Sequence, residues 1–246
     1  MPRYFIELTY KGTRYSGFQS QPNALTIQAA IETALQTRYK QPFELTCSSR
    51  TDAGVHALQN FFHVDTEITI EPQHIYNLNA LVPSDIVIKQ ITRVPDTAHA
   101  RFGATHRCYK YYITNQRNPF LTETAWFYPY TLDIEALHLA AKMVLVHIDF
   151  TAFSKRNTQV KTFICHIMNS QWYYEKDCLV YEVKANRFLR GMVRGLVGTM
   201  LQVGRGIITI NQFKEIIEGK DCTKANFNTP AHGLFLAEVA YPEGLL

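Results

Sequence analysis

The feature that most constrains the fold is the order in which two apolar patterns follow one another along the chain. From Ile27 to Leu35, apolar side chains recur at intervals of three and four residues, as on one face of a helix, and Thr26 precedes them as a candidate N-cap. Shorter apolar runs on both sides of this segment indicate strands. The first hundred residues therefore predict a strand, a helix, two strands, a helix and a strand, over residues 4–10, 27–35, 43–47, 58–64, 72–81 and 85–94.

The second half of the chain repeats this order. The same patterns predict strands over residues 107–114, 163–174, 179–185 and 234–240, helices over 133–146 and 188–203, a further short strand over 125–130 and a further helix over 211–218. The β-α-β-β-α-β order is the ferredoxin-like arrangement. We therefore expect an α+β protein with two ferredoxin-like domains side by side, residues 1–97 and 98–246, and a central cleft between them.

Composition narrows the class of protein. The chain of 246 residues is 46% hydrophobic and 19% charged, which is typical of a folded globular protein, and it has no run of the roughly 20 apolar residues that span a bilayer. Its five cysteines are scattered without a C-x-x-C pair, which argues against a disulfide framework and a zinc site. Met1–Phe5 resembles the start of a strand rather than a signal peptide. We therefore expect a protein of the reducing cytoplasm, with no membrane association.

The distribution of charge permits a nucleic-acid partner. The net charge is +4 and the pI is about 8.7, a mild excess that does not by itself require a polyanion. Basic residues alternate with aromatic ones over residues 101–112, and five more basic residues gather over 184–205. Such mixtures fit a strand of nucleic acid, since cations contact phosphates and rings stack on bases. Solvated strand and helix faces are an equally open explanation.

The segment from Arg50 to His56 is the strongest candidate for a catalytic site. In an extended segment, residues i and i+2 project to the same side, so Arg50 and Asp52 can face one pocket. A nearby cation favours an ionised carboxylate, which suits a nucleophile or a base. A salt-bridged surface turn is the ordinary alternative for such a pair. The predicted strands on both sides favour chemistry, because loops between rigid strands commonly carry functional residues.

Two residues of the second half could complete this site if the expected cleft forms. Tyr109 lies in a strand where it and Tyr111 point one way and Lys110 the other, so its ring could stack on a base or belong to the core. Arg194 lies in a strongly apolar helix, where a buried arginine requires an anion, and Asp52 is a candidate. The alternative is a packing seam from which the arginine reaches water.

Several other chemistries lose support from the sequence. The histidines show no metal-ligand spacing, and each is more readily explained as an ordinary polar residue. Phosphate-binding, dinucleotide-binding and serine-nucleophile motifs are missing, which disfavours nucleotide hydrolysis, dinucleotide redox chemistry and serine acyl transfer. We therefore expect a reaction that uses neither a cofactor nor a metal.

The motifs resemble those of the tRNA pseudouridine synthase A (TruA) family almost from end to end. The segment from Arg50 to Ala57 is similar to the family's signature, with Asp52 at the catalytic position. Three further stretches match. They are Tyr10-x-Gly12-x-x-Tyr15-x-Gly17-Phe18-Gln19-x-Gln21, His99-Ala100-Arg101-Phe102 with Tyr109, and Phe188-x-x-x-Met192-Val193-Arg194-x-x-Val197-Gly198 followed by the strand at Gly233-Leu234-x-Leu236. Ser49, Phe18 and Lys161 depart from residues usual in the family, and Ser49 could alter the loop.

The resemblance implies an activity and a role for each candidate residue. It implies isomerisation of uridine to pseudouridine at nucleotide positions 38–40 in the anticodon stem-loop of tRNA, by a homodimer that needs no cofactor, metal or DNA. Asp52 would be the catalytic carboxylate and Arg194 its ion-pair partner. Arg50 would hold open the flipped nucleotide, and Tyr109 would stack on the target uracil.

Two other functions remain open from the residues alone. An N-glycoside hydrolase would act on the same bond, although retaining glycosidases use two carboxylates about 5 Å apart and only Asp52 lies in the motif. A non-catalytic RNA chaperone would keep Asp52 for structure only.

Overall fold

The computed structural model describes residues 1–156 and 160–246, which form an α+β protein. Nine strands and five α-helices lie within these residues. The chain contacts group into two compact units, one of residues 1–105 with 235–246 (the first unit) and one of residues 106–234 (the second unit). The sequence predicted a boundary after residue 97. In the structure, the connection 98–105 and the last strand group with the first unit instead of the second. Two ferredoxin-like domains therefore stay a prediction.

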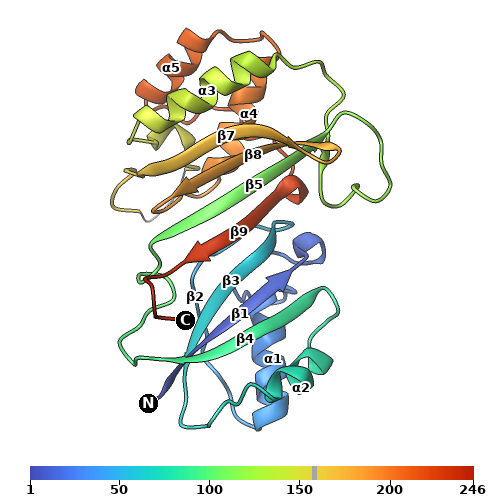
Figure 1. The fold of residues 1–246 in the computed structure, drawn as a ribbon, viewed down its shortest axis with the longest axis vertical. Helices are drawn as coiled ribbons and strands as arrows, with labels where there is room; N and C mark the ends of the chain where they lie inside the picture. Colours follow the sequence, from blue (N-terminus) through green and yellow to red (C-terminus); the bar gives the residue numbers. More distant parts are fainter. Residues whose placement is uncertain (157–159) are drawn as a thin grey trace. The chain divides into compact units, whose positions relative to one another are not determined.

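The sheet of the first unit is built around its longest strand, β3 (His56–Asp65). Strand β1 (Arg3–Tyr10) pairs antiparallel with both β3 and β4 (Ile86–Val94). The short strand β2 (Thr46–Cys47) pairs antiparallel with the C-terminal half of β3. The last strand, β9 (Leu234–Ala240), pairs in parallel with the start of β3, so distant segments of the chain meet beside the Asp52 loop (Figure 1).

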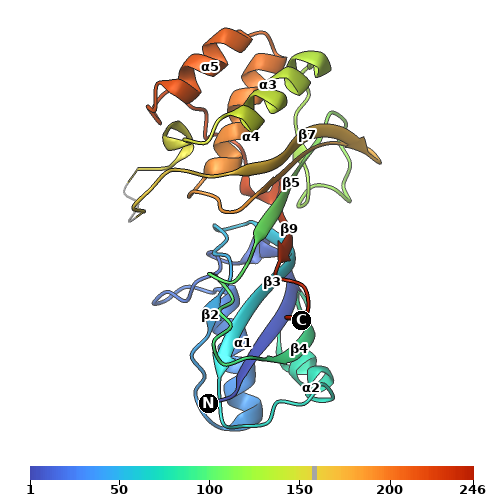
Figure 2. The same cartoon turned by 60° about the vertical axis from the view of Figure 1, so that its left-hand side comes forward.

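Two helices lie against the sheet of the first unit. Helices α1 (Ile27–Tyr39) and α2 (His74–Leu81) lie side by side on one face of it (Figures 1 and 2). The Thr26 hydroxyl accepts a hydrogen bond from the Ala29 amide at 3.3 Å, which confirms the predicted N-cap. The predicted apolar face of α1 is buried at its positions 27, 31, 34 and 35.

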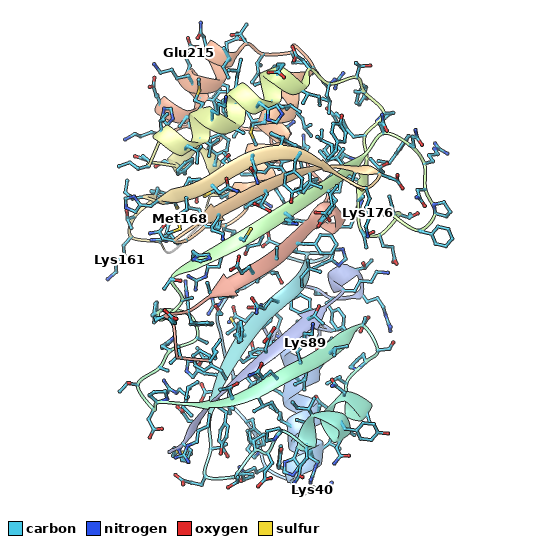
Figure 3. All side chains as sticks on the ribbon, in the orientation of Figure 1. Lys40, Lys89, Lys161, Met168, Lys176 and Glu215 are labelled. Atoms are coloured by element: carbon cyan, nitrogen blue, oxygen red, sulfur yellow. The ribbon has the colours of Figure 1, made fainter. Side chains whose placement is uncertain are left out.

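The second unit has an antiparallel sheet in the order β5 (His106–Thr114), β8 (Cys178–Ala185) and β7 (Ile167–Glu175). Strand β6 (Trp126–Phe127) runs parallel beside β5. Figure 3 labels Met168 on β7 and Lys176 in the turn that leads to β8. Helices α3 (Ile134–Val146), α4 (Met192–Gly204) and α5 (Ile210–Glu218) cover one face of this sheet (Figures 1 and 2).

Several elements differ from their predicted bounds, and α1, β2, β6, β7 and α4 differ by three or four residues at one end. Strand β2 is shorter than residues 43–47, and β7 begins at Ile167 because the preceding residues make only an isolated bridge between Asp149 and Ile164. Helix α4 begins at Met192 rather than at residue 188. The cause is Gly191, whose φ of 76° lies in the left-handed region that a right-handed helix cannot continue through. Within the described residues, no helix is long and apolar enough to cross a membrane.

Candidate active site

Asp52 lies in the connection between β2 and β3, and it is half-buried. The Val55 amide donates a hydrogen bond to the Asp52 carbonyl oxygen at 3.1 Å, which closes a turn directly after the carboxylate. Thr51 on one side and Val55 on the other are buried, at 7% and 2% exposed. The turn that carries Asp52 is therefore anchored at both ends, and the aspartate itself stays partly accessible.

Arg50 is exposed, and its guanidinium interacts with the buried Cys47 thiol. Burial raises the pKa of Cys47, while hydrogen bonding and charge from Arg50, together with the charge of Arg101, act in the opposite direction. Two guanidinium groups of the first unit therefore lie within electrostatic range of this sulfur.

The segment that follows β1 holds the Asp52 loop from the side. The Phe18 amide donates to the Thr51 carbonyl oxygen at 3.1 Å, and the Gly54 amide donates to the Tyr15 carbonyl oxygen at 3.4 Å. The two bonds lie on opposite sides of Asp52 in the sequence. Residues 12–18, which matched the family's opening motif in the sequence, therefore support the loop that carries the carboxylate.

Sequence reasoning gave no role to these supporting residues. The clearest signal it could have used is Asn60, a polar residue inside the apolar strand 58–64 that the structure shows to be fully buried. A buried amide requires hydrogen-bond partners, so its position predicts a polar cluster nearby. The close packing at Gly12, where a Cβ would lie 1.9 Å from the Val55 carbonyl oxygen, has no comparable signal in a single sequence.

Tyr109 lies on β5 with its ring only partly buried. The ring packs edge-on against Phe188, with centroids 5.0 Å apart and an interplanar angle of 82°. Tyr111 is fully buried and donates to the Pro230 carbonyl oxygen at 2.7 Å, whereas Lys110 pairs with Glu175 at 3.0 Å. The predicted alternation along this strand is thus confirmed, with Tyr111 as the core ring and Tyr109 as the more accessible one.

Arg194 lies in the first turn of α4 and is half-buried. Its Nε donates to the Thr229 carbonyl oxygen at 2.8 Å, and the Thr229 hydroxyl donates back to the Arg194 carbonyl oxygen at 2.9 Å. Burial raises the pKa of Tyr111, while Arg194 acts to lower it, so the guanidinium lies within electrostatic range of the middle of β5. The Nε hydrogen bond holds the guanidinium against the segment that carries Thr229, within electrostatic range of Tyr111 on β5.

The glycines of α4 permit close packing against the helix. A Cβ on Gly195 would lie 2.8 Å from the Phe227 ring, and one on Gly198 would lie 2.3 Å from the Asn226 carbonyl oxygen. The segment that carries Thr229 therefore lies directly against the helix. Asp52 belongs to the first unit, whereas Tyr109 and Arg194 belong to the second, so their meeting in one cleft and the pairing of Asp52 with Arg194 stay predictions.

The α+β fold carries a partly accessible aspartate on a turn that is held by backbone hydrogen bonds, which is an arrangement typical of an enzyme. Comparison with known families gives the class of enzyme. The family model described as tRNA pseudouridine synthase matches residues 8–103 and 140–242, so the chain belongs to this family of isomerases, which form pseudouridine in tRNA. The resemblance found in the sequence is thereby confirmed. Arg50, Asp52 and Arg194 lie within the matched residues, whereas Tyr109 lies between the two matched segments.

Individual relatives match the whole chain. It is 47% identical to the tRNA pseudouridine synthase A of Parabacteroides distasonis, covering 100% of this chain and 98% of that protein. The proteins of the same name from Bacteroides thetaiotaomicron and Porphyromonas gingivalis are 43% and 42% identical. Both alignments include 100% of this chain. They include 93% of the Bacteroides thetaiotaomicron protein and 99% of the Porphyromonas gingivalis protein.

Proposed function

We propose that this protein converts uridine to pseudouridine in the anticodon stem-loop of tRNA, with Asp52 as the catalytic carboxylate. One observation carries the proposal: the signature aspartate is half-buried on a turn that backbone hydrogen bonds hold on both sides, between buried Thr51 and buried Val55. A side chain held in this way keeps a constant direction while it remains within reach of a large substrate.

The reaction is an isomerisation, so its atoms balance without an oxidant or a reductant. The N1–C1′ bond breaks, the uracil turns, and C5 joins C1′ while the hydrogen on C5 is released and N1 takes up a proton. An ionised Asp52 can promote this by attack on C1′, by attack on C6, or by removal of a proton from C2′. All three routes require the negative carboxylate that a neighbouring guanidinium favours.

The target nucleotide must first leave its stack in the RNA, which costs a few kcal/mol. Arg50 is exposed at the start of the Asp52 loop and can occupy the space that the nucleotide leaves. Tyr109 presents a partly exposed ring that can stack on the extruded uracil, and stacking on an aromatic ring contributes about 1–3 kcal/mol per base. The two contacts can together offset the cost of extrusion.

Arg194 completes the proposed site as the partner of Asp52. Its Nε is already bound to the Thr229 carbonyl, so the guanidinium plane is set before any substrate arrives. A cation fixed in this way keeps a carboxylate ionised in a dry pocket. We further propose that the protein acts in the cytoplasm as a homodimer, with the site in a cleft between its two domains.

The test is release of tritium from tRNA that carries 5-tritiated uridine. We expect the wild-type protein to release tritium and D52N to release none while still binding tRNA. The matched control is D133N, because Asp133 caps α3 by accepting from the Ala136 amide at 3.0 Å and asparagine caps helices equally well. Full turnover by D52N would remove Asp52 from the mechanism.

The same experiment separates the two rival functions. Free uracil without pseudouridine would identify a nucleoside hydrolase, since water would then have captured the sugar. Accelerated refolding of tRNA by both the wild type and D52N, with neither tritium release nor free uracil, would identify a chaperone.

A further inference from the structure

A buried polar network adjoins the Asp52 loop. The phenol oxygen of Tyr10, the last residue of β1, lies 2.8 Å from Oγ1 of Thr51, and either hydroxyl can donate. Asn60 on β3 donates from Nδ2 to the same phenol oxygen at 3.2 Å. All three side chains are buried, at 4%, 7% and 0% exposed. Thr51, the residue directly before Asp52, is therefore tied through its hydroxyl to two strands of the sheet.

The Asn60 side chain also donates a hydrogen bond directly to the loop that carries Asp52. Nδ2 also donates to the Ser49 carbonyl oxygen at 2.9 Å, and Oδ1 accepts from the Phe61 amide at 2.9 Å. Ser49 and Thr51, the residues on either side of Arg50, are thus both held by this network. Buried polar groups that are fully hydrogen-bonded make their surroundings rigid and specify one arrangement.

A bulge in the sheet brings Asn60 into this position. Leu8 pairs with Asn60 and Tyr10 pairs with Ala57, so the register between β1 and β3 shifts within two residues. Bulges bend a strand and redirect its side chains, and they are frequent beside active sites. The shift lies between exposed Leu58 and buried Asn60, at the point where β3 passes into the fully buried stretch 60–64.

We propose that Tyr10 and Asn60 are positioning residues for the reaction, because they hold the Thr51 hydroxyl and thereby fix the direction of the Asp52 carboxylate. The inference rests on the proposed role of Asp52. Thr51 has two anchors: its carbonyl oxygen accepts from the Phe18 amide, and its hydroxyl joins the network. With the hydroxyl anchor removed, the peptide before Asp52 can turn about the remaining hydrogen bond.

The test removes the hydroxyl without changing the shape of the side chain. T51V deletes it, T51S keeps it, and Y10F deletes the hydroxyl at the other end of the hydrogen bond. With saturating enzyme and tritiated tRNA, we expect the single-turnover rate to fall about 10–100-fold in T51V and Y10F, because displacements of about 1 Å have effects of this size. T51S should keep the wild-type rate. The dissociation constant for tRNA should be unchanged in all three, since the network contacts the loop and not the RNA.

The second unit offers a matched control. The Tyr181 hydroxyl lies 2.8 Å from the Ser170 hydroxyl and is equally buried, so Y181F deletes a comparable hydrogen bond away from the Asp52 loop. We expect Y181F to keep the wild-type rate at a temperature where all variants are folded, as checked by circular dichroism.

Each outcome bears on a different claim. A wild-type rate in T51V, or an equal loss of rate in Y181F, overturns the inference and leaves the proposed function intact. A wild-type protein that releases no tritium overturns the proposed function and the inference with it.

Discussion

The backbone amide of Gly12 donates a hydrogen bond to Nδ1 of His56 at 3.0 Å. Because Nδ1 accepts this hydrogen, the neutral imidazole carries its own proton on Nε2. His56 is buried at 1% exposed, and its ring packs on Phe235 of β9 with centroids 4.5 Å apart. The end of the Asp52 loop is thus fixed between the segment after β1 and the last strand of the chain.

Replacement of Gly12 by alanine should displace this loop. Its Cβ would lie 1.9 Å from the Val55 carbonyl oxygen, a backbone atom that cannot move alone, so we expect G12A to lose about 3 kcal/mol of stability and most of its activity. Thermal unfolding and tritium release measure the two effects. The comparison variant is G206A: Gly206 has a φ of 68° and nothing within 4 Å of an added Cβ, so it should lose about 1 kcal/mol and no activity. Equal losses in both variants would contradict the clash.

Two substitutions at Tyr109 separate its ring from its hydroxyl. The ring packs edge-on with Phe188 and is partly exposed, so we expect Y109F to keep most of the single-turnover rate and Y109A to lose at least tenfold. The rates are measured with saturating enzyme and tritiated tRNA. Losses of equal size would show that the hydroxyl, and not the stacking surface, is what the reaction uses.

We expect that lysine cannot take over the function of Arg194. An arginine can donate from Nε to the Thr229 carbonyl at 2.8 Å and still direct its terminal nitrogens elsewhere, whereas the single ammonium of lysine cannot do both. We expect R194K to lower kcat about 100-fold. T229V keeps the carbonyl that holds Nε and loses only the hydroxyl bond to the Arg194 carbonyl, so its kcat should change far less. A fully active R194K would show that a fixed guanidinium is not required.

Acid should destabilise the first unit through His63. Burial lowers the pKa of His63 to about 4, with help from the charges of Arg3 and His99 and against the charge of Asp65. The unfolded chain binds a proton below about pH 6.5 and the folded chain does not until about pH 4, so this stability is complete above pH 6.5 and is lost as the pH falls toward 4.

The size of this effect is up to about 3 kcal/mol, from the difference between the two pKa values. We expect the midpoint of thermal unfolding to fall between about pH 7.5 and pH 5, and to fall less in H63Q. Glutamine retains an acceptor for the Ala100 amide, which now donates to His63 Nδ1 at 3.2 Å. An unchanged slope in H63Q would assign the acid sensitivity to other groups.

The features that the sequence predicted are those encoded by near neighbours. The cap at Thr26 and the buried face of α1 depend on residues three or four apart, and Asp52 stood out as a candidate because Arg50 and the flanking strands are its near neighbours in the sequence. Helix α4 began late because apolar periodicity does not report the backbone conformation of Gly191.

The supporting contacts of the site lie beyond the reach of such patterns. The hydrogen bonds from Tyr10 to Thr51, from Gly12 to His56 and from Asn60 to Tyr10 join residues 41, 44 and 50 positions apart. Which polar side chains meet is decided only when β1 and β3 pair with a bulge, and a single sequence shows neither the pairing nor the register.

The parallel pairing of β9 with β3 has a consequence for biosynthesis. His56 lies opposite Phe235 and Ala57 opposite Leu236, so the strand that leaves the Asp52 loop obtains this neighbour only after the ribosome has translated the whole second unit. A nascent polypeptide can form α1 and the β1–β3 ladder early, yet it cannot seat the imidazole of His56 against Phe235 until that residue has left the exit tunnel. Competence for RNA modification is therefore expected to arise after translation of Leu236, in a late folding event that closes the first unit with the last strand.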